Sequence, residues 1–249
     1  MIIDAFLTPY FPETENQFED SVVVMIDVLR ASTTVCAALN AGAKEVIPSD
    51  SLDKAVRIYN SLSREARFLG GERNGLMPQG FDAGNSPFEY VPEKVKGRSV
   101  ILSTTNGTKT FQKAKNAKHK VVAAFSNNAV ITDYIRNLLS EYVSNDAKLI
   151  FLCAGTNGRL SYEDVLCAGV IIHEISRDYT DCTITDTADA ARNLYSYNAS
   201  DMKNFLMKSD HAKILAANGF EKDIDFCLTL DTLPVIPIVG SNTIRALDI

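Results

Sequence analysis

The chain has 249 residues, 46% of them hydrophobic, and a formal net charge of −6. It can therefore bury a large core, and its acidic balance argues against nucleic acid or an anionic membrane as a partner, because both need a basic face. No run of about 18 uncharged apolar residues occurs, and residues 1–15 lack the basic start of a signal peptide, so we expect a cytoplasmic protein with no membrane span.

The five cysteines are an odd number, and none of them forms a C-x-x-C pair. Such thiols are expected to be reduced and mostly buried, rather than part of a disulfide or a metal site. Reduced thiols agree with a cytoplasmic location.

The first predicted unit begins with a continuous β-branched run, Ser21 to Asp27 (SVVVMID), which is typical of a strand buried on both faces of a parallel sheet. A polar turn leads into a short helix over 34–41, and Gly42 is placed to cap it. Residues 44–48 then resume as a strand. The order is strand, polar loop, helix, strand.

The second unit repeats that order. Strand 99–103 ends in the polar loop TTNGT, whose Asn-Gly pair is also a hairpin signal. The residues that follow do not alternate and are rich in helix formers, so a helix is favoured over a return strand. Gly107 and Thr108 would lie at its N-terminus, where free backbone N–H groups bind anions. A strand over 119–125 completes the unit.

Aligning the two units places Asp27 opposite Ser103, and Arg30 opposite Asn106. This correspondence suggests two copies of one β-loop-α-β unit. Any two βαβ units look partly alike, so the alignment is an interpretation of the pattern.

A third strand over 147–153 leads through a Gly- and Asn-containing loop into a helix over 165–175. Ser161, with Asp164 three residues later, predicts a capping box for this helix. Three strands thus end in polar loops that open helices, and in a parallel sheet such loops lie at the carboxyl ends, where these sheets bind ligands. The Gly-, Pro- and Asn-rich stretch 69–87 is predicted to lack regular structure, and as an ordered loop of this length it would usually be functional.

We therefore expect one α/β domain over residues 1–249, with three layers (α/β/α) around a largely parallel or mixed sheet. The repeated units would span about 21–90 and 98–180, followed by a C-terminal α/β segment. In that segment the pattern predicts helices around 187–196, 200–208 and 210–218, then strands near 224–229 and 235–239.

Several common motifs are missing from the sequence. It contains no G-x-x-x-x-G-K-[ST], no G-x-G-x-x-G and no G-x-S-x-G, which argues against nucleotide-binding loops and the usual serine hydrolase elbow. With three histidines, it is also a poor match for a His-rich zinc or iron site. What remains is oxygen-donor chemistry in the predicted loops.

Acids and arginines gather in those loops. Carboxylates suit a hard cation such as Mg²⁺, and guanidinium groups bind phosphate, sulfonate or carboxylate bidentately. The acids are Asp27, Glu72, Asp82, Glu163 and Asp164, and the arginines are Arg30, Arg73 and Arg159. Acids for a metal, arginines for anions and a hydroxyl-rich helix start together indicate phosphate chemistry.

These residues also have structural interpretations. Asp164 could be only a helix cap, and Glu72 with Arg73 only a solvated surface pair. His211, at a predicted helix start, is interpreted as structural. Asp27 is harder to explain in this way, because an acid that ends a buried apolar run is costly unless something pairs with it.

Five longer motifs occur in order: IDVLRASTT, GGER, GFDAGNSP, STTNGT and CAGTNGRLSYEDVLCAG. Together they closely resemble the 2-phosphosulfolactate phosphatases of the ComB family, and the likeness extends from IIDAFLTPY to GFEKDIDFCLTLDTLPVIP. Ser32 and Ser103 stand where the family pattern usually has Thr, and His211 is followed by Ala where it tends to have Gly. The resemblance implies a Mg²⁺-dependent hydrolase that removes phosphate from 2-phospho-3-sulfolactate, a step on one route to coenzyme M.

The resemblance also implies a metal site. Mg²⁺ would be held by Asp27, Glu72 and one of Asp82, Glu163 or Asp164, and it would position the attacking water. In a rival assignment, Asp27 is the nucleophile and forms an aspartyl phosphate.

The substrate would be bound by the loop residues. Arg73, with Ser126 and Asn127, would hold the sulfonate or carboxylate group. The residues expected to surround the phosphoryl group are Arg30, Ser32, Thr104, Thr105, Asn106, Gly107 and Thr108. Of these, Arg30, Thr105 and Asn106 join Asp27 as the expected catalytic residues.

Other functions remain open at this point. The same site could act on another small phosphorylated carboxylic acid, or the chain could be a non-catalytic anion-binding protein. Several carboxylates near the ligand argue against the second, because they repel an anion. A threonine-nucleophile amidohydrolase using Thr104 or Thr105 would need a base that no Lys or His motif supplies. The oligomeric state is also open, and a homodimer is compatible with the sequence.

Overall fold

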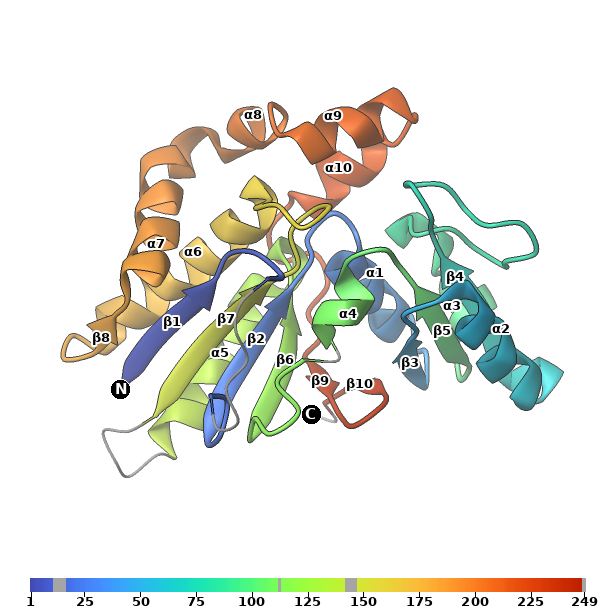
Figure 1. Cartoon of the computed structure of the whole chain (residues 1–249), viewed down its shortest axis with the longest axis horizontal. Coiled ribbons are helices and arrows are strands. Elements are labelled where there is room, and N and C mark those ends of the chain that lie inside the picture. The colour runs from blue at the N-terminus through green and yellow to red at the C-terminus, as the bar shows by residue number, and fades with distance from the viewer. Residues whose placement is uncertain (11–16, 112, 142–146, 248–249) are drawn as a thin grey trace.

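The computed structural model describes residues 1–10, 17–111, 113–141 and 147–247. Within these ranges, ten strands form one sheet in the order β4-β5-β3-β10-β9-β6-β2-β7-β1-β8 (Figure 1). The strands are β1 (Ile2–Phe6), β2 (Ser21–Ile26), β3 (Glu45–Pro48), β4 (Arg67–Gly71), β5 (Ser99–Ser103), β6 (His119–Ala123), β7 (Lys148–Cys153), β8 (Thr183–Ile184), β9 (Pro237–Val239) and β10 (Ile244–Ala246). The helices are α1 (Ala31–Asn40), α2 (Leu52–Ser61), α3 (Pro92–Val95), α4 (Gly107–Phe111), α5 (Asn128–Ser140), α6 (Tyr162–Asp178), α7 (Asp186–Asn198), α8 (Met202–Leu206), α9 (Asp210–Ala217) and α10 (Glu221–Cys227).

The sheet consists of two parallel half-sheets joined by one antiparallel hairpin. Strands β4, β5 and β3 are parallel in one half, and β6, β2, β7, β1 and β8 are parallel in the other. The hairpin β9–β10 lies between them, with β9 antiparallel to β6 and β10 antiparallel to β3. The prediction of an α/β fold with a mixed, mostly parallel sheet is confirmed.

The strand order is symmetric about this hairpin. Strands β2, β3 and β4 follow one another in the chain with α1 and α2 between them, as β5, β6 and β7 do with α4 and α5. In this correspondence β2 matches β5, β3 matches β6 and β4 matches β7. The order β4-β5-β3 on one side of the hairpin then corresponds to β7-β2-β6 on the other side. A duplicated unit would produce this arrangement, although the duplication itself stays a prediction.

Alternating side chains of the central strands build the layers. Val22 and Val24 of β2 join a buried cluster with α5, α6 and α7, whereas Val23 and Met25 join a cluster with α1 and α4 on the opposite face. All four are fully buried, as expected for a central strand covered on both faces. A smaller cluster packs α2 against β4 and β5. These clusters give the predicted three layers.

Two local predictions had different outcomes. Gly42 ends α1 as predicted, since its φ of +85° favours glycine and its N–H bonds to the Leu39 carbonyl at 2.9 Å. The strand predicted at 224–229 is wrong, because the structure has helix α10 there. Its buried apolar residues recur three and four positions apart, which is the helical period: Ile224, Cys227 and Leu228.

The remaining predictions concern cysteines and membranes. All five cysteines are free and four of them are buried, as expected. Among the described helices, none is long and apolar enough to cross a membrane. Helices α9 and α10 lie over the edge of the sheet from which the loops after β2 and β7 project (Figure 1).

Candidate active site

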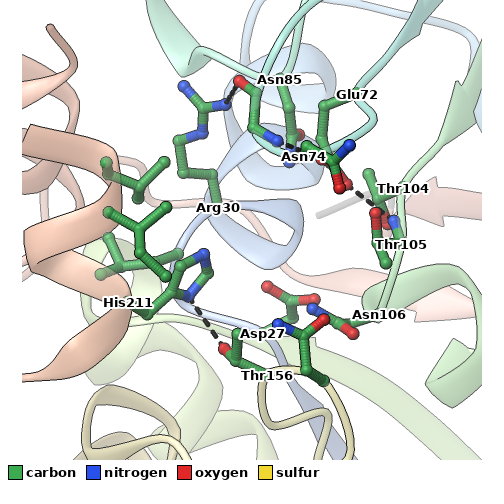
Figure 2. A pocket seen from close by; sticks show the side chains of 15 residues that line it. Asp27, Arg30, Glu72, Asn74, Asn85, Thr104, Thr105, Asn106, Thr156 and His211 are labelled. Carbon is green, nitrogen blue, oxygen red and sulfur yellow. Dashed lines mark hydrogen bonds between the residues drawn. The ribbon is translucent and has the colours of Figure 1, made fainter. Parts of the chain in front are cut away.

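A cavity of about 190 Å³ lies where the loops after β2, β4, β5 and β7 meet α9. The loops that were predicted to gather at strand ends therefore do so, and they come from both half-sheets. Figure 2 shows their side chains around the cavity. The polar residues that line it are Asp27, Arg30, Glu72, Asn74, Asn85, Thr104, Thr105, Asn106, Thr156, Asn157 and His211.

Asp27 directly follows β2 and is only 6% exposed. Its Oδ1 accepts one long hydrogen bond, 3.3 Å, from the Ala31 N–H. A Cβ at Gly107 would lie 2.6 Å from its Oδ2, so this position requires glycine. Burial raises the pKa of Asp27 to about 6, against the lowering effect of His211. Glu72 contributes to this raised pKa, so a cation or proton at Asp27 is favoured.

Arg30 is buried and held on three sides. Its Nη1 donates to Asp223 Oδ2 at 2.6 Å, its Nη2 donates to the Gly75 carbonyl at 2.8 Å, and its guanidinium lies 4.1 Å from the centre of the Phe220 ring. Asp223 also accepts a bond from Ser86 Oγ. The sequence interpretation missed Asp223, although it lies in the FEKDIDF motif. Arg30 is thus fixed at the cavity with a balanced charge.

The loop after β5 forms another wall of the cavity (Figure 2). Thr104, Thr105 and Asn106 lie there, and helix α4 follows directly, so the helix that was favoured over a hairpin is confirmed. Thr105 Oγ1 is buried and has no hydrogen-bond partner within the described residues. Thr108 lies in α4, and its side chain is outside the described part of the structure. The loop therefore supplies hydroxyl and amide groups to the cavity.

Glu72 holds this loop in place from the end of β4. Its Oε1 accepts from the Thr105 N–H at 2.7 Å, and its Oε2 accepts from the Gly75 N–H at 2.8 Å. One carboxylate thus joins the loops after β4 and β5.

Asp164 does the same for the loops after β7 and β2. Its Oδ1 accepts from the Val28 N–H at 2.8 Å, and its Oδ2 accepts from the Gly155 N–H at 2.9 Å. Burial raises its pKa well above the ordinary value. The predicted capping box is therefore wrong: Ser161 is the N-cap residue of α6, but its hydroxyl contacts Thr156 Oγ1 at 2.8 Å.

His211, interpreted from the sequence as structural, lies in the cavity wall. Its Nδ1 lies 3.0 Å from Thr156 Oγ1 (Figure 2). The same Nδ1 lies 3.1 Å from Glu163 Oε1. Glu163 is 1% exposed, and its Oε2 has no hydrogen-bond partner within the described residues. Glu163 thus orients the histidine and keeps one acceptor unused.

Asp82 and Arg73 are among the predicted site residues that do not line the cavity. Asp82 Oδ2 accepts a hydrogen bond at 2.8 Å from the N–H of Leu69, which lies in β4. The Arg73 guanidinium donates to the Glu72 carbonyl at 2.6 Å and to Ser103 Oγ at 3.0 Å. Both side chains therefore hold the segment after β4 against β4 or β5.

Three predicted substrate-binding residues also lie in the framework behind the cavity. Ser32 Oγ accepts from the Asp27 N–H at 2.8 Å. Asn127 Oδ1 accepts from the Ala124 N–H, and its Nδ2 donates to two backbone carbonyls. Ser126 is fully buried, and its Oγ has no hydrogen-bond partner within the described residues.

Two Asn-Gly turns line the cavity from opposite half-sheets, and the sequence interpretation missed their asparagines. Asn74 and Gly75 have φ of +55° and +81°, and Asn157 and Gly158 have φ of +51° and +78°. Each turn is closed by an antiparallel bridge between its flanking residues. The Asn-Gly pair that recurs in GGERNG and GTNGR is the sequence signal that could have indicated these two turns.

The donor groups suit Mg²⁺ in the form in which proteins usually bind it. Within the described ranges, no three His, Cys, Asp or Glu side chains converge on one metal position. Mg²⁺ does not need such a cage, because it commonly binds one or two carboxylates, waters and a substrate phosphate. Asp27 fits this role, since it is buried near other acids and accepts little hydrogen bonding.

Comparison with known proteins shows similarity over nearly the whole chain. A family model described as 2-phosphosulpholactate phosphatase matches residues 7–242. A "Probable 2-phosphosulfolactate phosphatase" from Caldanaerobacter subterraneus subsp. tengcongensis is 35% identical over 245 residues, which is 96% of this chain and 98% of that protein. Proteins with the same description from Clostridium novyi and Thermotoga maritima are 36% and 35% identical, over 90% and 95% of this chain and 91% and 94% of their own.

Proposed function

Because the chain belongs to the 2-phosphosulfolactate phosphatase (ComB) family of phosphoric monoester hydrolases, we propose that it hydrolyses 2-phospho-3-sulfolactate to 3-sulfolactate and phosphate, with Mg²⁺ as cofactor. Its product would serve sulfolactate or coenzyme M biosynthesis. The observation that carries this proposal is the cavity that brings the buried Asp27 and Arg30 to the polar loop after β5.

The phosphate of the substrate would lie between Arg30 and the loop after β5. Arg30 is already fixed by Asp223 and the Gly75 carbonyl, so it needs no reorganisation when charge develops on the phosphoryl oxygens. Thr105 Oγ1 is available to donate a hydrogen bond, since it has no partner within the described residues. Asn106 lines the same wall and would donate its amide N–H.

Asp27 would be the main protein ligand of Mg²⁺. When bound, Mg²⁺ supplies positive charge to the phosphate and lowers the pKa of a bound water. Glu72 and Asp164 already accept two backbone N–H bonds each, so only their remaining lone pairs could serve. Neither Glu163 nor Asp82 lines this cavity, but Glu163 contacts His211 in its wall and has an Oε2 without a partner within the described residues. Glu163 is thus the better of the further candidates.

The rival role of Asp27 is nucleophilic attack on phosphorus. Its carboxylate would displace 3-sulfolactate and form an aspartyl phosphate, which water would then hydrolyse. Trapping with labelled substrate separates the two roles, because only the nucleophile becomes labelled.

The proposal is tested by phosphate release from 2-phospho-3-sulfolactate with Mg²⁺ and with excess EDTA, beside 2-phospholactate. We expect Mg²⁺-dependent release that falls sharply without the sulfonate. Equal release from both compounds would indicate a phosphatase for another small phosphorylated acid. No release from either would contradict the proposed function.

A further inference from the structure

A second cavity of about 680 Å³ adjoins the first and shares Thr156, Asn157, His211 and Ile214 with it. It is formed by the loop after β7, the start of α6 and the start of α9. A ligand bound at Asp27 could therefore extend past His211 into this second space.

Two cations line the second cavity, Arg159 and Lys208. Neither side chain makes an ion pair or hydrogen bond with another described residue, and both are exposed. Neither acid of the same cavity pairs with these two cations. Glu163 is held against His211 at 3.1 Å, and Asp210 has a side chain that is 98% exposed and paired with Lys213. The two cations are thus available to an anion.

The first cavity offers much less positive charge. Its one arginine within the described residues, Arg30, is balanced by Asp223 at 2.6 Å. Arg73, which was expected to hold the sulfonate, donates its guanidinium to the Glu72 carbonyl and to Ser103 instead. A substrate with two strongly acidic groups would find a cation for only one of them there.

The two Asn-Gly turns differ in charge at the residue that follows the glycine. In the turn after β4, the residue that follows Asn-Gly is Leu76, which is 54% exposed. In the corresponding turn after β7, it is Arg159. Two turns of the same shape thus carry an apolar residue in one half and a cation in the other. This difference would give a bound substrate a fixed direction.

Resting on the proposed function, we propose that Arg159 and Lys208 form the subsite for the sulfonate group of the substrate. A sulfonate is a strong acid with three oxygens, and it matches a guanidinium fork together with an ammonium group. The phosphate would lie on the Asp27 and Arg30 side of His211, and the sulfonate, on the adjacent carbon, would lie on its Arg159 side. Arg159 and Lys208 would thus determine the specificity for a sulfonated substrate.

The test uses Arg159→Gln and Lys208→Gln, with 2-phospho-3-sulfolactate and 2-phospholactate as substrates. Each variant should raise the KM for the sulfonated substrate about tenfold, as expected for loss of one charge-assisted hydrogen bond. The KM for 2-phospholactate should change less than about twofold, because that compound does not use the subsite. Arg177→Gln and Lys222→Gln are matched controls, since both residues are exposed cations on α6 and α10 that line neither cavity.

Equal effects on the two substrates, or no effect on either, would overturn the sulfonate subsite while leaving the phosphatase in place. Calorimetric binding of 3-sulfolactate and lactate gives an independent readout that needs no turnover. If the wild type released no phosphate but bound 3-sulfolactate more tightly than Arg159→Gln did, the subsite would stand and the proposed function would fail. Equal binding by the two proteins would reject the subsite.

Discussion

Two buried carboxylates, Glu72 and Asp164, make equivalent hydrogen bonds in the two half-sheets. Each accepts two backbone N–H bonds and thereby joins the loops of two adjacent strands. They differ in position: Glu72 lines the cavity, whereas Asp164 lies behind it and is 2% exposed. The comparison shows that an acid beside a predicted site can be framework rather than ligand. Asp27, by contrast, accepts a single long hydrogen bond from the backbone.

The largest effect should come from removing the deeper carboxylate. Asp164→Ala leaves the Val28 and Gly155 N–H groups buried without their acceptor, and each costs about 1–3 kcal/mol. We expect a loss of about 3–4 kcal/mol in the free energy of unfolding, measured by urea denaturation. A loss below about 1 kcal/mol would show that Asp164 does not hold the two loops.

Asp27→Asn should instead stabilise the protein while abolishing activity. Because burial raises the folded-state pKa from 3.8 to about 6, the free energy of unfolding falls as the pH rises between these values. Above this window the ionised group costs up to about 3 kcal/mol, since one pKa unit corresponds to about 1.4 kcal/mol. Asparagine removes that cost and keeps an acceptor for Ala31.

Urea denaturation in EDTA, at about pH 5 and about pH 7.5, checks this prediction. The stability gain of Asp27→Asn over the wild type should be larger at the higher pH. A gain that does not vary with pH, or a loss at both values, would contradict a raised pKa.

Glu72→Gln should separate activity from stability. The glutamine amide oxygen can still accept from one of the Thr105 and Gly75 N–H groups, but its NH₂ group cannot accept from the other. The free energy of unfolding should therefore fall by about 1 kcal/mol. Activity should fall more than about tenfold, because the Thr105 loop loses its position at the cavity. Glu93→Gln on the exposed surface of α3 is the control. Unchanged kcat/KM in Glu72→Gln would show that the clamp does not serve the site.

The smallest effect is expected at the hairpin between the half-sheets. Arg245 Nη2 donates to Glu45 Oε2 at 2.6 Å and so ties β10 to β3. Arg245→Gln should cost about 0.5–1 kcal/mol at neutral pH, as for a partly exposed pair. Burial raises the pKa of Glu45, but the hydrogen bonds from Arg245 and Ser99 lower it by more, so the pKa is lowered overall.

This pair therefore stabilises the protein above the unfolded pKa of Glu45, near 4.5, and the stabilisation is lost as the pH falls through the folded value. Denaturation of Arg245→Gln and the wild type should give converging stabilities on acidification. A difference that persists at low pH would mean that the arginine acts through packing.

Sequence patterns predicted the strands and loops well where one signal dominated. The run Ser21 to Ile26 could only be a buried strand, and the polar loop after β5 did lead into a helix. The segment 224–229 is short and apolar, so its period was ambiguous, and it forms α10 instead. Short apolar runs of this kind need tertiary contacts for their assignment.

Predicting the site was harder, because sequence shows which residues share a loop but not where their side chains point. Asp27, Arg30 and Thr105 line the cavity, whereas the Arg73 side chain donates to Ser103 instead. The pairing of Arg30 with Asp223 spans 193 positions in the chain, and no local pattern reveals it.

The most direct test of the account compares phosphate release from 2-phospho-3-sulfolactate by the wild type and by Asp27→Asn, both with Mg²⁺. We predict Mg²⁺-dependent release by the wild type and none above background by a variant that is folded and at least as stable. Undiminished release by Asp27→Asn would contradict the central role of Asp27, whichever of its two roles, metal ligand or nucleophile, is correct.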